Sequence, residues 1–218
     1  MKNKVVLVVG GSTGIGLGTV KAFEELGCEV YSIDRSVCDI RDHKQIDRYM
    51  NNLKKIDILI NNAAINYCKK IEEICLEEWD NVIRTNLTSY FYIIKKSLPK
   101  MSRGSKIVNV SSIAGRNKSL VSGVHYTSSK AGIIGLTRQL AQELGPMGIN
   151  INCICPSQTL TPMLRESMSI EQLSELEAKI PLRRIANVQD IVKPIVFLSS
   201  DDSSYIHGAC LDVNGGQL

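Results

Sequence analysis

The chain has 218 residues, of which 44% are hydrophobic and 22% charged, and its formal net charge at pH 7 is +4. These values are ordinary for a globular protein, so we expect residues 1–218 to form a single domain with one core. They do not favour a nucleic-acid surface, and no apolar run approaches the roughly 18 residues that a membrane span needs.

The seven cysteines contain no CxxC pair, the spacing that is common in metal and redox sites. Cys153 and Cys155 are two residues apart in a strand-like segment, so their side chains share one face. We expect reduced thiols, several of them in the core, and no metal site. Residues 1–4 lead directly into a strand-like segment without a hydrophobic leader, which predicts a cytoplasmic protein.

Strand-like apolar runs alternate with segments of helical periodicity along the chain. Lys4–Val9 is apolar almost throughout, as expected of a strand that is buried on both faces, and a helix is predicted from about Gly14 to Leu26. The further predicted strands are Glu29–Asp34, Asp57–Asn61, Lys106–Ser111, Asn150–Cys155 and Ala209–Val213, and the further predicted helices are one that contains Trp79, one that starts near Asn86, Tyr126–Leu144 and Val188–Ser199. This alternation predicts an α/β fold with a three-layer, doubly wound parallel sheet of six or seven strands and helices on both faces.

A glycine-rich turn joins the first strand to the first helix. Glycine lets a backbone turn sharply and approach a pyrophosphate, and the free N–H groups at the start of the helix attract its charge. The position of the turn favours a dinucleotide site in a Rossmann-type fold over a plain strand–helix connection. The candidate cofactor-binding residues of this turn are Gly10, Ser12, Thr13, Gly14, Ile15 and Gly16.

Asp34 ends the second predicted strand, where a carboxylate can accept hydrogen bonds from both hydroxyls of an adenosine ribose. A 2′-phosphate would meet like charge there, so Asp34 favours NAD over NADP as the cofactor. Arg35 follows directly, and its guanidinium could hold a 2′-phosphate, stack on the adenine or lie in solvent.

Tyr126 and Lys130 are four residues apart at the start of a predicted helix, so they share one face. A free tyrosine has a pKa near 10, and a fixed ammonium beside it would lower that pKa toward neutrality. The pair alone is common on helix surfaces, and its meaning depends on the motifs around it.

Those motifs occur in a fixed order. They are Asn61-Asn62-Ala63-Ala64 after a strand, Asn86 on a helix, Val110–Gly115 with two serines, Pro156 with Thr161, and Tyr205–Gly208 with Asn214–Gly216. Together with the glycine turn, Tyr126 and Lys130, this set resembles the short-chain dehydrogenase/reductase family over essentially residues 4–216.

The resemblance implies a role for each matching residue. Tyr126 would exchange the hydroxyl proton while hydride moves to or from the nicotinamide, and Lys130 would tune Tyr126 and hold the nicotinamide ribose. Ser112 would orient the substrate oxygen, and Asn86 would position a water that connects Lys130 to solvent. The further cofactor-binding residues implied are Asp39, Ile40, Asn62, Ala63, Ala64, Tyr126, Lys130, Pro156, Thr159 and Thr161.

The chain departs from the family pattern at several points. Ala64 replaces a usual glycine, Ser157 follows Pro156 where glycine is usual, and one extra residue lies between Ser112 and Tyr126. Only four residues separate Asp34 from Asp39, where the family normally has a helix and another strand. We therefore expect the third strand to be very short or absent and Asp39 to hydrogen-bond the adenine.

The function expected is an NAD(H)-dependent oxidoreductase that interconverts a secondary alcohol and a ketone. The alternatives are an NADPH-dependent ketoreductase of 3-oxoacyl substrates, for which Arg35, Arg116 and Lys118 are hints, and a non-catalytic dinucleotide sensor or scaffold. The substrate is expected to be a small molecule chosen by Arg116–His125 and the irregular, lid-like Leu160–Arg184.

Two predicted helices, those near Asn86 and Tyr126, carry more apolar residues than one sheet-facing stripe needs. Examples are Tyr90, Phe91 and Ile94. Because the family usually pairs these helices across a two-fold axis, we expect a homodimer or homotetramer.

Overall fold

Six parallel strands form one sheet in the part of the chain that the computed structural model describes, residues 1–119, 121–162, 164 and 169–218. Their order across the sheet is β2-β1-β3-β4-β5-β6, and every neighbouring pair is parallel. The strands are β1 (Val5–Val9), β2 (Glu29–Ile33), β3 (Ile58–Asn61), β4 (Lys106–Val110), β5 (Asn150–Pro156) and β6 (Cys210–Val213). The predicted α/β fold of Rossmann type is thus confirmed, with six strands among these residues.

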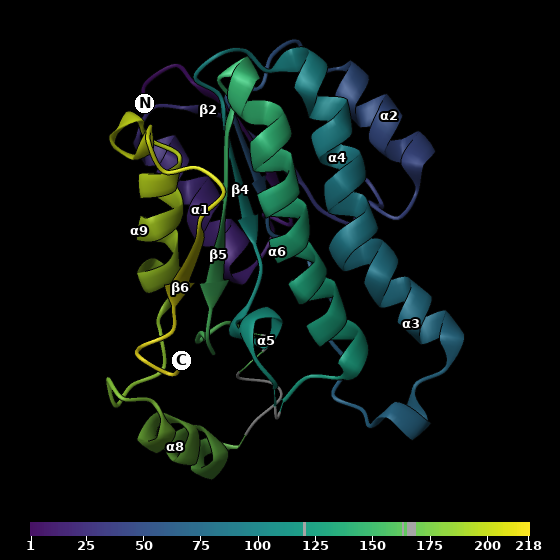
Figure 1. Ribbon diagram of the computed structural model, residues 1–218, viewed down its shortest axis with the longest axis vertical. Helices are drawn as coiled ribbons and strands as arrows, with labels where there is room; N and C mark the ends of the chain where they lie inside the picture. Colours follow the sequence, from purple (N-terminus) through teal and green to yellow (C-terminus); the bar gives the residue numbers. More distant parts are fainter. Residues whose placement is uncertain (120, 163, 165–168) are drawn as a thin grey trace.

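Helices cover both faces of the sheet, as predicted (Figure 1). On one face lie α1 (Gly14–Glu25) and α9 (Val188–Leu198), and on the other lie α2 (His43–Asn51), α4 (Ser89–Ser97) and α6 (Val124–Leu144). Three further helices, α3 (Leu76–Ile83), α5 (Ile113–Arg116) and α8 (Ile170–Lys179), lie toward the end of the molecule where strands β4 and β5 end.

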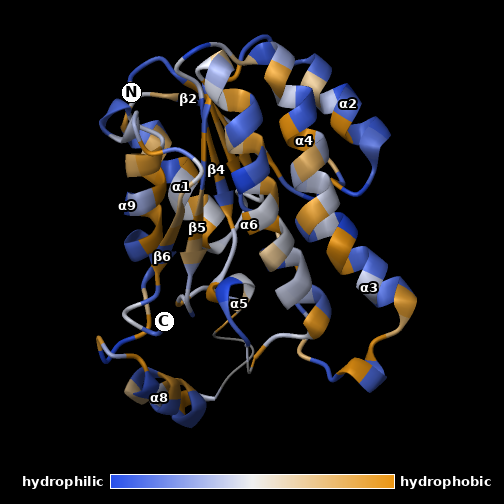
Figure 2. Ribbon diagram, in the orientation of Figure 1, coloured by the Kyte–Doolittle hydropathy of each residue, from blue (hydrophilic) through white to orange (hydrophobic). Residues whose placement is uncertain are grey.

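Side-chain alternation along the strands builds two cores. In β1, Val6 and Val8 pack with Phe23 of α1, while Leu7 and Val9 pack on the other side with Ile46 of α2. All six are fully buried, and Figure 2 shows mainly hydrophobic colours in the strands between the helical layers. A sheet that is buried on both faces requires such continuously apolar strands, which is why they stand out in the sequence.

The connection after β2 is short, as the sequence predicts. Residues 34–42, all of them described, contain no strand, and the chain turns through hydrogen bonds from the Val37 and Cys38 N–H groups to the Asp34 carbonyl. Helix α2, which follows directly, is not among the helices that the sequence predicts. Its start is marked by Asp42, whose carboxylate accepts from the N–H groups of Lys44 and Gln45.

The helices predicted around Trp79 and near Asn86 are one continuous helical run from Leu76 to Ser97. A π-helical turn, Arg84–Thr88, joins α3 to α4, and Asn86 lies in the middle of it. The expectation of a separate helix that starts near Asn86 is therefore wrong. Single π turns inside α-helices are rare and concentrate at functional sites.

The segment Leu160–Arg184 is less irregular than expected. It contains α8, which Ser169 caps by accepting from the Gln172 N–H. Within the two segments predicted to choose the substrate, residues 120, 163 and 165–168 lie outside the described residues.

Fewer apolar side chains on α4 are available for contact with a second chain than the sequence indicates. Tyr90 is fully buried and Ile94 is nearly so, while Phe91 remains 48% exposed. Two of the three apolar side chains therefore serve the core of the same chain. None of the described helices is long and apolar enough to cross a membrane.

Candidate active site

The predicted site residues lie where the parallel strands end. The glycine turn follows β1, Asp34 follows β2, Asn62 follows β3 and Ser111 follows β4, so their main chains meet at one edge of the sheet. In the order of strands, β1 stands between β2 and β3. The chain passes from β1 through α1 to β2 on one side of it, and then through α2, on the opposite face, to β3 on the other side. Ligands of doubly wound sheets bind at such a switch point.

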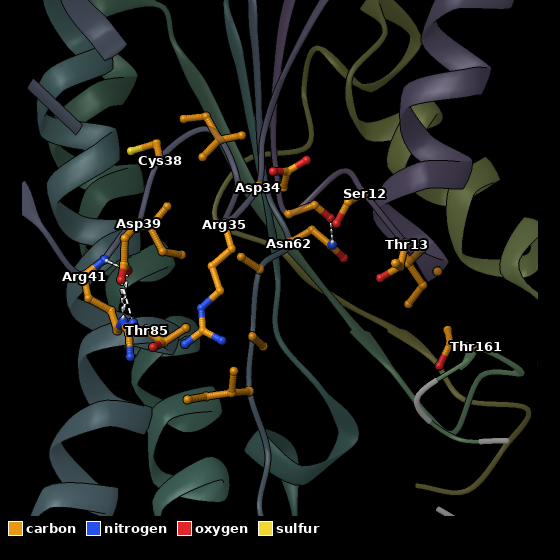
Figure 3. A pocket seen from close by; sticks show the side chains of 18 of the residues that line it. Ser12, Thr13, Asp34, Arg35, Cys38, Asp39, Arg41, Asn62, Thr85 and Thr161 are labelled. Carbon is orange, nitrogen blue, oxygen red and sulfur yellow. Dashed lines mark hydrogen bonds and ion pairs between the residues drawn. The ribbon is translucent and has the colours of Figure 1, made fainter. Parts of the chain in front are cut away.

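A cavity of about 330 Å³ opens at this point (Figure 3). This volume lies within the usual range for small-molecule sites. The predicted cofactor-binding residues that line it are Gly10, Ser12, Thr13, Gly14, Ile15, Asp34, Arg35, Asp39, Ile40, Asn62, Ala63, Ala64 and Thr161. We call it the dinucleotide cavity.

Two glycines of the turn hold its shape. Gly10 has a φ of +83°, and a Cβ there would lie 2.7 Å from Ala63 Cα, so the close approach of the two chain segments requires glycine. A Cβ on Gly16 would lie 1.9 Å from the Gly10 carbonyl oxygen. Gly16 does not line the dinucleotide cavity, so glycine is needed at this position for close packing against Gly10.

The turn is suited to a pyrophosphate. Asn62 Nδ2 donates to the Gly10 carbonyl oxygen at 2.9 Å and fixes the turn against the end of β3. The first N–H groups of α1, beginning at Gly14, have no carbonyl within the helix to bind, and they carry the positive end of the helix dipole. Backbone donors beside a cavity fit the pyrophosphate of an adenine dinucleotide.

Asp34 is a charged acceptor among the lining residues of the cavity. Its Oδ1 accepts from the Ser36 hydroxyl at 2.6 Å and from the Ser36 N–H at 2.9 Å, and these bonds lower the pKa of Asp34. The carboxylate is therefore ionised at neutral pH. Figure 3 shows the Arg35 side chain extending into the middle of the cavity.

Arg41 is a site residue that the sequence analysis missed. Its guanidinium holds both carboxylate oxygens of Asp39, with Nε at 2.9 Å from Oδ1 and Nη2 at 2.5 Å from Oδ2, and its Nη1 donates to Asn81 Oδ1 at 2.8 Å. These hydrogen bonds lower the pKa of Asp39 to about 2. Arg41 lines the cavity too, so the carboxylate predicted to meet the adenine is already paired.

A second cavity, of about 510 Å³, adjoins the first and shares Ile15, Asn62 and Thr161 with it. Ser112, Tyr126 and Lys130 line it together. Pro156 and Thr159, both predicted to bind the cofactor, line it as well. Three of the four predicted catalytic side chains thus meet in one space, which we call the catalytic cavity.

Lys130 lies almost entirely out of solvent, with 1% of its surface exposed. Its Nζ donates to the Val110 carbonyl oxygen at 2.8 Å and lies 5.5 Å from the centre of the Tyr126 ring. Helix α6 is itself tied to β4, because the Ser111 hydroxyl donates to the Lys130 carbonyl at 2.8 Å. Ser111 therefore has a structural role.

Burial governs the titration of the pair. It lowers the pKa of Lys130 to about 7, and it raises the pKa of Tyr126, which the bond with the Ser112 hydroxyl opposes. The expected lowering of the Tyr126 pKa by Lys130 is not found, because burial also disfavours the ammonium that would cause it.

Asn86 is fully buried and lines neither cavity. Its Oδ1 accepts from the Ile65 N–H at 2.9 Å, and its Nδ2 donates to the Ile65 carbonyl at 2.9 Å and to Ser129 Oγ at 3.1 Å. Asn86 thus clamps the segment after Ala64 to helix α6. Ile65 itself lines the dinucleotide cavity.

The rest of the described lining of the catalytic cavity mixes polar and apolar side chains. Lys130 is the only Lys, Arg, His, Asp or Glu among its described lining residues, so Arg116 and Lys118 do not line it. Arg116 instead pairs with Asp212, at 3.0 Å. The polar side chains that line the cavity and could contact a substrate are Asn66, Ser119, Ser122, Gln158 and Gln172.

Comparisons with known proteins agree with this geometry. Residues 33–217 match the family model described as Enoyl-(Acyl carrier protein) reductase. The 3-oxoacyl-(acyl-carrier-protein) reductase FabG of Haemophilus influenzae is 33% identical, over 99% of this chain and 98% of its own length. The acetoacetyl-CoA reductase of Rhizobium meliloti is 36% identical over the same shares.

A solved structure is similar along nearly the whole chain. It is the ligand-free aldohexose dehydrogenase of Thermoplasma acidophilum, with a TM-score of 0.91 and 30% identity. The similarity covers 99% of this chain and 94% of that one. The shared fold therefore extends through both cavities.

Proposed function

Because the chain belongs to the short-chain dehydrogenase/reductase family and is thus an oxidoreductase that acts on CH–OH groups, we propose that it interconverts a secondary alcohol and a ketone with NAD(H). The observation that carries the proposal is the meeting of Ser112, Tyr126 and Lys130 in one cavity beside the glycine turn. A non-catalytic sensor would have no need of this arrangement.

In this proposal Tyr126, Ser112 and Lys130 have different roles in proton transfer. Tyr126 donates a proton to the ketone oxygen, or accepts it from the alcohol, and Ser112 holds that oxygen in place. Lys130, with a pKa of about 7, gains and loses a proton near neutrality, which suits a group that relays protons to Tyr126. The nicotinamide, when bound, accepts or delivers the hydride at the carbon that carries the oxygen.

The charge of Asp34 supports NAD rather than NADP as the cofactor. An ionised carboxylate accepts hydrogen bonds from ribose hydroxyls and repels a 2′-phosphate. The residues that would hold the dinucleotide are those of the glycine turn, Asp34, Ile40 and Asn62–Ala64.

The second candidate is an NADPH-dependent ketoreductase of 3-oxoacyl substrates. It is favoured by the names of two relatives, a 3-oxoacyl-(acyl-carrier-protein) reductase and an acetoacetyl-CoA reductase. Arg35 extends into the dinucleotide cavity and could pair with a 2′-phosphate. The described lining of the catalytic cavity, in which Lys130 is the only Lys, Arg, His, Asp or Glu, instead supports a neutral substrate.

A cofactor-and-substrate screen tests the proposal. The full chain is assayed with NAD⁺ and NADP⁺ against polyols, sugars, hydroxy acids and cyclic diols, and with NADH and NADPH against acetoacetyl-CoA, by following the reduced nicotinamide. We expect turnover of a neutral alcohol with NAD⁺. Turnover confined to NADPH and the thioester would replace the first candidate by the second.

The proposal extends to the location and oligomeric state of the enzyme. We propose a cytoplasmic single-domain enzyme that acts as a homodimer or homotetramer through α4 and α6, with Phe91 at the contact, since it is a large apolar side chain left exposed on α4.

A further inference from the structure

Three of the seven cysteines gather on one side of strands β5 and β6. Cys153 and Cys155 alternate along β5 and so share a face, and Cys210, the first residue of β6, is the register partner of Cys153. Their side chains pack together against Ile134 of α6. We call Cys153, Cys155 and Cys210 the β5–β6 thiol cluster.

Strand geometry distinguishes the possible pairs in this cluster. Register partners on neighbouring strands stand about 4.8 Å apart, which is within the 4.4–6.8 Å between Cα atoms that a disulfide spans. Residues two apart along one strand are about 6.6 Å apart, at the upper limit of that span. Bonding of Cys153 to Cys210 therefore requires less movement than bonding of Cys153 to Cys155.

The two thiols of the cross-strand pair differ in exposure and charge. Cys153 is completely buried, whereas Cys210 is partly exposed at the edge of the sheet. A hydrogen bond from the Cys153 thiol, together with the charges of Arg138 and Arg116, lowers the pKa of Cys210 to about 6. The pKa of Cys153 is raised by its two sulfur neighbours and by burial. Cys210 thus has the accessible, cation-flanked setting of a reactive thiolate.

We propose that Cys210 is a site of oxidation by hydroperoxides and that it then forms a disulfide with Cys153. The Cys210 thiolate attacks the peroxide, so that an S–O bond forms, the O–O bond breaks and two electrons pass from sulfur to oxygen. Cys153 then attacks the sulfur of the sulfenic acid. An S–S bond forms, the S–O bond breaks, and the leaving oxygen takes the Cys153 proton as water. Two thiols and one hydrogen peroxide give one disulfide and two waters.

The Cys153–Cys210 disulfide would link edge strand β6 to strand β5, which ends at the catalytic cavity. Strand β5 ends at Pro156, which lines that cavity, and β6 is held to the sheet through β5. The described residues offer no competing explanation of the cluster as a metal site, because they contain no group of three ligating side chains in suitable positions.

Peptide mapping of the reduced full chain after treatment with stoichiometric hydrogen peroxide tests this proposal. We expect a linkage between the peptides of Cys153 and Cys210 that forms before Cys68 and Cys75 are oxidised. Those two are exposed thiols outside the cluster and serve as internal controls. Oxidation of Cys210 no faster than that of Cys68 and Cys75 would overturn the proposal without any variant.

Serine variants identify the partner. Cys153→Ser should lose the linkage and accumulate a Cys210 sulfenic acid that dimedone traps, whereas Cys155→Ser, the matched control, should keep the linkage. Loss of the linkage in Cys155→Ser but not in Cys153→Ser would assign the bond to Cys155 and contradict the proposed pair.

Discussion

The Lys130 ammonium nitrogen lies 2.8 Å from the Val110 carbonyl oxygen, and both groups are buried at the end of strand β4. This bond stabilises the protonated amine in a place where burial disfavours it, and it holds the side chain beside Tyr126.

Tyr126→Phe removes the hydroxyl that is proposed to exchange a proton with the substrate. We expect turnover to fall by about 10²–10⁴-fold, the usual contribution of a general acid or base. Dinucleotide affinity should fall far less, because the ring and Lys130 remain. The measurement is steady-state kinetics on the best alcohol of the screen, with Tyr205→Phe, at a fully exposed tyrosine, as the control. Unchanged turnover in Tyr126→Phe would refute the catalytic assignment.

Lys130→Met should change how stability depends on pH. The folded pKa of Lys130 is about 7 and its ordinary value is 10.5, so between these pH values the unfolded chain binds a proton that the folded chain lacks. Unfolding then takes up a proton, and the wild-type free energy of unfolding rises with pH by up to about 1.4 kcal/mol per pH unit in this window. Lys130→Met lacks this contribution. Urea unfolding at several pH values between 7 and 10 measures the two slopes, and equal slopes would mean that Lys130 titrates as it does in water.

Asn86→Ala should destabilise the fold near the dinucleotide cavity. It leaves the half-buried N–H and carbonyl of Ile65 without their 2.9 Å partners. Each unpaired group costs about 1–3 kcal/mol, so we expect a loss of about 2–4 kcal/mol in the free energy of unfolding. Asn117→Ala, at an exposed asparagine, should change it by less than about 0.5 kcal/mol. A loss in Asn86→Ala no larger than in this control would show that water or a rearranged chain replaces the clamp.

Gly16→Ala and Gly135→Ala form a matched pair of helical substitutions. A Cβ on Gly16 meets the Gly10 carbonyl oxygen at 1.9 Å, whereas a Cβ on Gly135 meets nothing within 4 Å. We expect Gly16→Ala to lose more than about 2 kcal/mol of stability through overpacking. Gly135→Ala should gain about 0.5–1 kcal/mol, because alanine favours helix. Thermal and urea unfolding measure both, and a stable Gly16→Ala would show that the turn can shift.

Arg41→Met should weaken dinucleotide binding. It removes the donors that hold the Asp39 carboxylate and leaves an unpaired negative charge in the cavity. If the uncompensated Asp39 charge costs about 1.4 kcal/mol of binding, affinity for NADH falls roughly tenfold, measured by fluorescence titration. Arg48→Met removes the same charge from the exposed side of α2 and should bind as the wild type does. Equal affinities in both variants would show that Arg41 has no part in the site.

The strands of the sheet could be predicted because buried parallel strands must be apolar on both faces. Helix α2 could not be recognised in the same way. Its buried side is only Ile46 and Met50, and the remaining residues are polar. Asp42, followed three residues later by Gln45, is the sequence pattern that could have indicated the start of this helix. The joining of α3 to α4 was missed because a π turn interrupts the 3.6-residue period on which the prediction depends.

The sequence predicts those residues of the site that belong to recognisable motifs. Tyr126, Lys130 and Ser112 do meet in one cavity. Arg41 was missed because its partner Asn81 is 40 residues away, on a helix whose position depends on the whole fold. The low pKa of Lys130 depends on its burial, which no local spacing encodes.

The π turn around Asn86 has a consequence at the level of the gene. Such a turn contains one residue more than the α-helical path between the same ends, so the deletion of a single codon within Arg84–Thr88 would convert it to regular helix. The helices on both sides of the deletion would keep their orientation, and only residues within the turn would change direction. The Asn86 amide would face away from Ile65 although its codon was intact. The clamp thus depends on the number of residues in the turn as well as on Asn86 itself, and a one-codon deletion here should remove the clamp while the flanking helices keep their places.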